Sequence, residues 1–282
     1  MLDWHNKRQV LSSVKPREIM RNVRKTLLRS FYYFLGETLF PLGHPLAKGI
    51  IIPLESPFCR LRRYLFISFN TEVLPMKNIV VLVSGGGTNL QALIDAERSG
   101  EIKGGRITCV ISSKEGAYAL ERAAKADIPT RVIPRKEYSD SLSYSKAVLE
   151  ALNEEKADLV VLAGFMTILD ECVTSAYAYK IINVHPALIP SFCGEGFYGL
   201  KVHEAALAYG VKVSGATIHF VNEKADAGAI ILQGTVDVQR DDTPEVLQKR
   251  IMENVEWKLL PKAVSLFCQD RIDIVDGKAY IK

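Results

Sequence analysis

Apolar runs of strand length alternate with helical patterns from residue 78 onward, and this order constrains the fold more than any other feature. Residues 78–83, 107–111 and 130–133 read as strands, with helical spacing between them. Residues 157–164 are almost continuously apolar, which is typical of a central parallel strand covered on both faces. This βαβ order implies right-handed crossovers. The sequence therefore predicts an α/β fold with a doubly wound, mostly parallel, Rossmann-like sheet.

The last third of the chain has a different pattern. Residues 214–221 and 229–233 read as two further strands. Residues 244–267 predict a long amphipathic helix, broken or kinked near Pro261, because proline has no N–H to donate. Residues 272–281, with Asp-Gly at their centre, predict a terminal hairpin.

The first 75 residues differ in composition from the rest. Residues 1–75 hold 12 Lys and Arg against 5 Asp and Glu, whereas residues 76–282 hold 24 against 27. The basic stretch 15–29 predicts a short helix, and prolines and charges break the apolar run 31–54 too often for a membrane span. We interpret residues 1–75 as an extension of uncertain structure, disordered or produced by a misplaced start; an organelle transit peptide is the alternative. Residues 76–282 form the expected catalytic domain.

The charge and the cysteines exclude some classes of protein. The excess of acidic residues over 76–282 argues against a nucleic-acid surface there. The five cysteines are scattered and odd in number, without CxxC spacing, which indicates free thiols in a reducing compartment. We therefore expect a cytoplasmic enzyme that acts on small molecules. The sequence leaves its oligomeric state open.

A glycine-rich turn follows the first strand of the domain. Ser84-Gly85-Gly86-Gly87-Thr88-Asn89 leads directly into a helical pattern. Strand, glycine turn and helix together aim backbone N–H groups and a helix N-terminus at an anion. The third glycine of a dinucleotide fingerprint is replaced by Leu90, and no Walker lysine follows. We predict that Gly87, Thr88 and Asn89 bind a phosphate monoester, with the side chains of Thr88 and Asn89 as further donors; a turn that merely joins strand to helix is the alternative.

An amide and an imidazole end another apolar run. Asn183 and His185 stand two residues apart in Ile181–Pro186, so they project from one side of an extended segment, at the sheet edge where α/β folds bind ligands. Asn can donate to a carbonyl oxygen, and His can move a proton near neutral pH. A capping Asn with a buried, hydrogen-bonded His is the purely structural alternative.

Asp226 lies on a loop after a later strand. If that loop reaches the same sheet end, its carboxylate would meet His185 and Asn183, where it would raise the pKa of the imidazole and fix its tautomer. No GxSxG motif is present, and His185, His203 and His219 lack zinc spacing, so we expect no metal. Direct acyl transfer to an amine through a tetrahedral intermediate fits these groups best.

Four motifs resemble those of the phosphoribosylglycinamide formyltransferase family. They are the glycine turn 84–90, the segment 162–169, Asn183-Val184-His185-Pro186, and residues 215–221 leading to Asp226. The resemblance spans the chain from Met76 to the end. It implies transfer of a formyl group from 10-formyltetrahydrofolate, as co-substrate, to the amine of glycinamide ribonucleotide in purine biosynthesis.

The resemblance also implies roles for individual residues. Asn183 would hold the formyl oxygen, His185 would stabilise the intermediate, and Asp226 would order a proton-carrying water. Glu256 would lie near the glycinamide. The folate would be bound by Met166, Thr167, Ile168, Leu169, Asn183, Asn222 and Asp226.

Two features depart from the family pattern, and two rival functions remain. Thr167 and Ser141 stand where family members often carry Arg, which puts the folate-tail contacts in question. Formyltetrahydrofolate hydrolase shares the Asn, His and Asp, but its relatives lack the glycine turn and carry a regulatory domain ahead of the catalytic one. A non-catalytic phosphate- or folate-binding module is the second rival.

Overall fold

The structure of this chain, a computed structural model, describes residues 49–54, 63–68 and 75–282. The chain divides into two compact units, Met1–Thr71 and Glu72–Lys282. In the first unit, strand β1 (Gly49–Leu54) pairs with β2 (Arg63–Ser68) in antiparallel orientation. The predicted basic helix over 15–29 lies outside the described residues.

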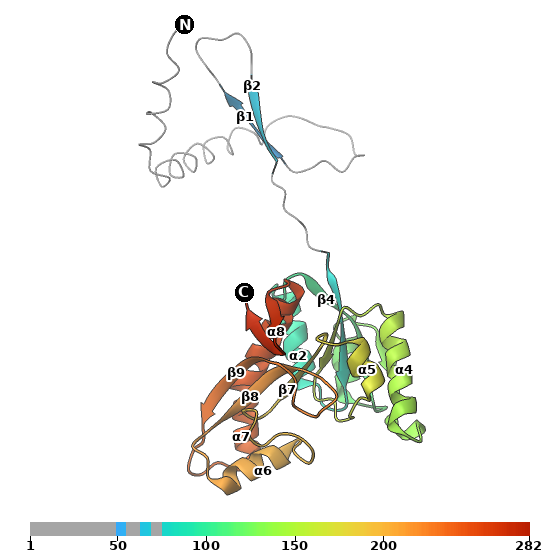
Figure 1. The fold of residues 1–282 in the computed structure, drawn as a ribbon, viewed down its shortest axis with the longest axis vertical. Coiled ribbons are helices and arrows are strands. Elements are labelled where there is room, and N and C mark those ends of the chain that lie inside the picture. The colour runs from blue at the N-terminus through green and yellow to red at the C-terminus, as the bar shows by residue number, and fades with distance from the viewer. Residues whose placement is uncertain (1–48, 55–62, 69–74) are drawn as a thin grey trace. The chain divides into compact units, whose positions relative to one another are not determined.

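The second unit contains a seven-stranded sheet with the order β5-β4-β3-β6-β7-β8-β9 (Figure 1). Neighbouring strands from β5 to β7 pair in parallel, and β7–β8 and β8–β9 pair antiparallel. The predicted doubly wound, mostly parallel sheet is therefore confirmed. The strands are β3 (Lys77–Val83), β4 (Gly105–Ser112), β5 (Thr130–Val132), β6 (Leu159–Leu162), β7 (Ile181–His185), β8 (Val213–Phe220) and β9 (Ile230–Asp237).

Helices cover both faces of the sheet because the central strands are apolar on both sides. In β3, Ile79 and Val81 belong to one buried cluster, whereas Val80 and Leu82 belong to the other. The first cluster is closed by α2 (Thr88–Arg98), α3 (Tyr118–Ala124), α7 (Pro244–Ile251) and α8 (Trp257–Cys268). The second is closed by α4 (Ser141–Glu154) and α5 (Glu171–Ala176), and α6 (Leu200–Tyr209) packs beside α7.

The long C-terminal helix is irregular, but the irregularity lies about one turn before Pro261, the position that the sequence predicted. A π-helical turn, η2 (Met252–Glu256), separates α7 from α8, and Pro261 lies inside α8. The proline ring would crowd the carbonyl of Trp257, four residues earlier, and the π-helical turn ends just before that residue. The prediction of one long helix is confirmed, but its irregularity is a widened turn upstream of Pro261.

The predicted terminal hairpin is present. Strands β10 (Ile272–Val275) and β11 (Lys278–Ile281) pair antiparallel. Asp276 and Gly277 both have positive φ, as a two-residue type I′ turn requires. Ile272 and Ile274 pack against the first buried cluster, so the hairpin extends the core past the end of α8.

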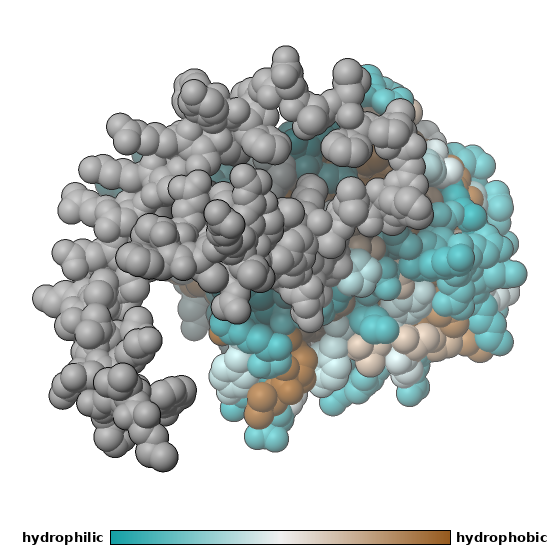
Figure 2. All heavy atoms as spheres, turned by 90° about the horizontal axis from the view of Figure 1, so that it is seen from above, coloured by the Kyte–Doolittle hydropathy of each residue, from teal (hydrophilic) through white to brown (hydrophobic). Residues whose placement is uncertain are grey.

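The part of the chain that the structure describes has a mostly hydrophilic surface in the view of Figure 2 and no helix that could cross a membrane. Hydrophilic residues dominate the part of that surface visible in Figure 2, with apolar residues in scattered patches. Within residues 49–54, 63–68 and 75–282, no helix has the length and apolar content that crossing a bilayer demands.

Candidate active site

Strand β7 carries the predicted amide–imidazole pair in the interior of the sheet. It lies between β6 and β8, so its backbone is hydrogen-bonded on both sides, and His185 is only 4% exposed. The register places Asn183 opposite His219 and His185 opposite Thr217. The side chains of Asn183 and His185 lie on one face, as expected from their spacing.

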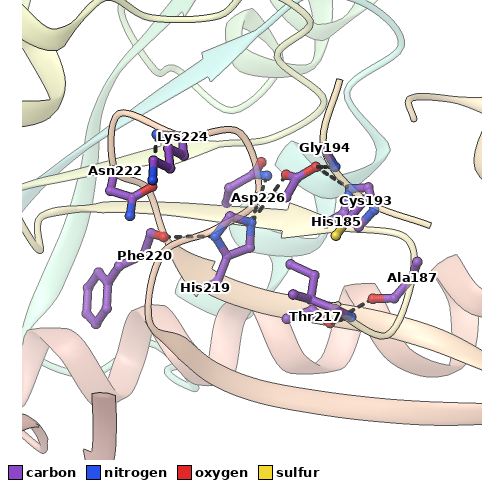
Figure 3. Close-up of polar contacts among 12 residues, drawn as sticks. His185, Ala187, Cys193, Gly194, Thr217, His219, Phe220, Asn222, Lys224 and Asp226 are labelled. Carbon is purple, nitrogen blue, oxygen red and sulfur yellow. Dashed lines mark hydrogen bonds and ion pairs between the residues drawn. The ribbon is translucent and has the colours of Figure 1, made fainter. Parts of the chain in front are cut away.

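Asp226 meets both histidines of this strand pair. Its Oδ2 lies 3.4 Å from Nδ1 of His185, and its Oδ1 lies 3.6 Å from Nε2 of His219. Figure 3 shows the carboxylate of Asp226 turned toward the two imidazoles. The predicted meeting of Asn183, His185 and Asp226 is thus present in the structure.

The loop that carries Asp226 reaches His185 by a different route from the one predicted, in which the loop simply followed a strand ending at the same edge of the sheet. Because β8 runs antiparallel to β7, its last residue, Phe220, pairs with Ile182 near the start of β7. The following loop therefore begins at the opposite sheet end from His185, and it must fold back. Gly228 permits this return, since a Cβ at that position would lie 1.8 Å from the Phe220 carbonyl oxygen. Asp226 has φ of 54°, a conformation that Asp and Asn adopt more readily than most residues.

His219 was not among the predicted site residues, yet it orders the site. Its Nδ1 donates to the Phe220 carbonyl over 2.8 Å, so Nε2 is the ring nitrogen that faces Asn183 and Asp226. Nδ2 of Asn183 lies 3.2 Å from this Nε2 and donates to it. One Asn183 N–H is thereby fixed and the second stays available for a substrate oxygen. The alternation of polar residues along residues 217–219 was the signal that pointed to this face.

The loop after β7 supplies two backbone contacts that the sequence did not reveal. The Phe192 carbonyl accepts from Nε2 of His185 over 2.8 Å. The Gly194 N–H donates to Oδ2 of Asp226 over 2.9 Å. The side chains of His185 and Asp226 are therefore both held by a single turn, and Phe192 itself packs edge-on against Tyr209 of α6.

Burial and charge set the protonation of the pair. The pKa of His185 is not raised overall, contrary to the sequence prediction, because burial lowers it below 6.5 and the charge of Asp226 opposes this only in part. Burial raises the pKa of Asp226, but contacts from His219, Gly194 and His185 outweigh it and hold the pKa below 3.8. At neutral pH the site therefore pairs an ionised carboxylate with a neutral imidazole.

The glycine turn lies at the carboxyl end of β3, as predicted. Gly87 has φ of 70° and precedes α2, whose first residue is Thr88. The N–H groups of Gly87, Thr88 and Asn89 donate no hydrogen bond to any acceptor within residues 75–282. These unpaired donors at a helix N-terminus are the arrangement that binds anions.

The side chain of Asn89 has a different partner from the one expected. Its Nδ2 donates to Oε2 of Glu256 over 2.8 Å in the interior, so it does not face an anion. Its Oδ1 is buried and has no partner in the described part of the chain. Glu256 lies at the end of the π-helical turn η2, and such turns are frequent at functional sites. The turn thus places a buried carboxyl beside the candidate phosphate site.

Glu256 gives a pH-dependent prediction for stability. Burial raises its pKa from 4.5 to about 7, with partial opposition from Asn89. Its contribution to stability is full below pH 4.5 and is lost as the pH rises through 7. Relative to Glu256→Gln, the free energy of unfolding of the wild type should fall by about 3 kcal/mol over this range. Denaturant unfolding at several pH values measures this difference, with Glu253→Gln on the exposed side as control; parallel curves for Glu256→Gln and wild type would contradict it.

The predicted folate-contacting segment forms a loop after β6. Met166 is 52% exposed and Ile168 is 63% exposed, whereas Leu169 is buried. The Met166 N–H donates to Oγ of Ser84, which joins this loop to the start of the glycine turn. Ser141 lies beside the loop, with its Oγ 3.4 Å from the Ile168 carbonyl oxygen. Exposed apolar side chains at this edge of the sheet are suited to a flat aromatic ligand.

The remaining predicted folate contact, Asn222, lies on the loop that carries Asp226. Its Oδ1 accepts from the Lys224 N–H over 3.1 Å, which turns the loop at this point. Figure 3 shows Asn222 and Asp226 on the same loop, with the imidazole of His219 between β8 and the carboxylate.

The fold and this site together define a class. A protein-family model described as formyl transferase matches residues 77–264, which include the glycine turn, Asn183, His185 and Asp226. The chain therefore belongs to the formyl transferase family.

Individual relatives narrow the class further. A phosphoribosylglycinamide formyltransferase of Haemophilus influenzae is 42% identical over 206 residues, covering 73% of this chain and 94% of that protein. The trifunctional purine biosynthetic protein adenosine-3 of Bos taurus is 45% identical over 196 residues, covering 69% of this chain and 19% of that protein. Within the family, the chain belongs with the phosphoribosylglycinamide formyltransferases, as the sequence motifs predicted.

Solved structures agree with this placement. Glycinamide ribonucleotide transformylase 1 from Symbiobacterium toebii matches with a TM-score of 0.69 and 40% identity, over 73% of this chain and 94% of that one. A formyltetrahydrofolate deformylase from Pseudomonas syringae matches with a TM-score of 0.66 and 29% identity, over 78% of this chain and 69% of that one. The deformylase thus shares the fold at lower identity.

Proposed function

We propose that this chain transfers the formyl group of 10-formyltetrahydrofolate to the amine of glycinamide ribonucleotide, in purine biosynthesis. The convergence of Asn183, His185 and Asp226, at the sheet edge where the glycine turn also lies, carries this proposal. It supplies an oxyanion donor, a neutral imidazole and an ionised carboxylate within one cluster. The turn supplies unpaired N–H groups for the phosphate of the ribonucleotide.

The chemistry of the proposed step assigns a task to each group. The substrate amine forms a bond to the formyl carbon, and the formyl oxygen takes up negative charge in a tetrahedral intermediate. The free N–H of Asn183 stabilises that oxygen, a contribution of about 3–4 kcal/mol for such donors. The proton lost by the amine passes through a water to Asp226, and a proton reaches N10 of the folate as its bond to the formyl carbon breaks.

His185 acts in this scheme as a fixed dipole next to the carboxylate. Its Nε2–H is held by the Phe192 carbonyl, and its Nδ1 faces Asp226. When the intermediate forms, Nδ1 can take the amine proton that reaches Asp226 through the water, and the resulting imidazolium stabilises the developing charge until that proton is passed on to N10. The low pKa set by burial keeps the ring neutral until that moment.

The two substrates occupy adjacent parts of the catalytic edge in this proposal. The ribonucleotide phosphate is held by Gly87, Thr88 and Asn89, and Glu256 lies toward the glycinamide. The pterin lies against Met166, Ile168 and Leu169, next to Thr167 and the backbone near Asn222. The exposure of Met166 and Ile168 supports this, because a bound ring would remove both from water.

Hydrolysis of formyltetrahydrofolate is the second candidate, favoured by the structural similarity to the deformylase. The unpaired N–H groups of the glycine turn favour transfer, because hydrolysis has no phosphate substrate to hold. Purified protein should consume formyltetrahydrofolate only when glycinamide ribonucleotide is present, and should release formylated ribonucleotide in equal amount. Consumption at the same rate without the amine, with release of formate, would identify a hydrolase. Folate binding without turnover would support a non-catalytic module.

A further inference from the structure

We infer that Arg122, on helix α3, is a positioning residue that aims the backbone N–H groups of the glycine turn at the substrate phosphate. This inference rests on the proposed phosphate site and extends it to a helix that does not itself touch the ligand. Arg122 stands 36 residues after Gly86 in the sequence, and no motif of the sequence marked it.

Helix α3 holds two successive carbonyl groups of the turn. The Ala119 N–H donates to the Gly85 carbonyl over 3.0 Å. Nε of Arg122 donates to the Gly86 carbonyl over 2.8 Å. Nη1 of the same guanidinium donates to Oε1 of Gln91 on α2 over 3.0 Å. Arg122 therefore bridges the turn and the first helical residues that follow it.

Peptide geometry converts these contacts into a direction for the donors. In a planar trans peptide, the C=O of one residue and the N–H of the next point to opposite sides. Because the carbonyls of Gly85 and Gly86 point toward α3, the N–H groups of Gly86 and Gly87 point away from it. Neither N–H donates to an acceptor within residues 75–282. Among the donors assigned to the phosphate, the N–H of Gly87 is therefore oriented by the contact between Arg122 and the Gly86 carbonyl.

The Gly86 carbonyl needs such a restraint because, within residues 75–282, Arg122 is its one hydrogen-bond partner. The peptide between Gly86 and Gly87 is flanked by two glycines, which adopt both signs of φ at little cost. A Cβ on Gly87 would lie 2.7 Å from the Cβ of Ala119, so only glycine fits against α3 there. Because glycine is required at this position, the peptide between Gly86 and Gly87 could adopt two opposite orientations. The Arg122 hydrogen bond selects one of its two orientations.

The guanidinium is itself held in place. Its central carbon, Cζ, lies 5.0 Å from the centroid of the Tyr118 ring. This cation–π contact helps to hold the guanidinium group in place. Lys125, which directly follows the last residue of α3, also faces the Tyr118 ring but makes no hydrogen bond to the turn. Lys125 therefore provides a matched control, because its removal takes the same charge from α3 and leaves the turn untouched.

The test compares glycinamide ribonucleotide with its dephosphorylated ribonucleoside as formyl acceptor. For Arg122→Met, KM for the ribonucleotide should rise by about tenfold or more, with kcat at saturation nearly unchanged, because a charge-assisted hydrogen bond orders the donors before binding. The kcat/KM for the ribonucleoside should stay at the wild-type value. Arg122→Lys, which keeps a donor for the Gly86 carbonyl, should recover part of the loss, and Lys125→Met should behave as wild type.

The outcomes separate this inference from the proposed function. If wild type prefers the ribonucleotide but Arg122→Met loses activity equally with both acceptors, or keeps the wild-type KM, Arg122 does not position the turn. An equal rise of KM in Lys125→Met would show that only charge matters, which also overturns the inference. If wild type itself does not distinguish the two acceptors, the phosphate site fails instead. Thermal unfolding of each variant identifies any change that comes from loss of the fold.

Discussion

Replacing Asp226 with Asn is expected to lower kcat for formyl transfer by about 10²- to 10⁴-fold, the usual size of a general acid–base contribution. The neutral amide cannot accept the amine proton. It also removes the negative charge that keeps the pKa of His185 from falling further, so the imidazole takes up a proton less readily. Steady-state kinetics with both substrates measures the change in kcat. NMR titration of His185 should show its pKa below that of the wild type.

The fold should tolerate this replacement. Asn adopts the positive φ of residue 226 about as readily as Asp does, and the Gly194 N–H can still donate to the amide oxygen. The free energy of unfolding should therefore change by only about 1 kcal/mol. Asp241→Asn removes an exposed carboxylate of the same type and serves as control. Turnover of Asp226→Asn equal to that of the control would remove Asp226 from the mechanism.

Replacing Asn183 with Ala should lower kcat by about 10²- to 10³-fold, as loss of one oxyanion donor does in other acyl-transfer sites. The N–H that remains after the bond to His219 is the donor that the developing oxyanion requires. Because this interaction strengthens as charge develops, KM for formyltetrahydrofolate should change little. Steady-state kinetics with glycinamide ribonucleotide held at saturation separates kcat from KM.

A matched amide tests whether this effect is local. Asn153, near the end of α4, is exposed and lies outside the site, so Asn153→Ala should keep wild-type kinetics. A large rise of KM in Asn183→Ala, with kcat preserved, would show that Asn183 binds the folate without stabilising the intermediate. That outcome would leave the oxyanion without its proposed donor.

The sheet and most of its helices could be predicted because their patterns are local. The apolar run 157–164 and the glycine turn can each be recognised from fewer than ten consecutive residues. The structure has a strand and a turn at these predicted positions. Helix α5 was not predicted, since its six residues are too short to show a period. The antiparallel direction of β8 was not predicted either, because alternation of polar and apolar residues does not record strand direction.

The residues proposed for catalysis could be chosen from the sequence, but the contacts that orient them could not. Asn183, His185 and Asp226 are chemically distinctive residues within recognisable motifs. Phe192 and Gly194 act through backbone atoms, which any residue type supplies, so their identity gives no signal. Asn89 was expected to present its side chain to phosphate, but only the fold brings Glu256 to within hydrogen-bonding distance across 167 residues. Such long-range pairings arise from packing and are absent from local patterns.

A crystal structure of the protein with glycinamide ribonucleotide and a non-transferring analogue of formyltetrahydrofolate tests the central claim most directly. The phosphate is predicted to accept from the N–H groups of Gly87, Thr88 and Asn89. The substrate amine should lie within reach of a water on Asp226, and the oxygen of the analogue should accept from Nδ2 of Asn183. A phosphate bound away from the glycine turn, or a formyl position out of reach of Asn183, would contradict the account.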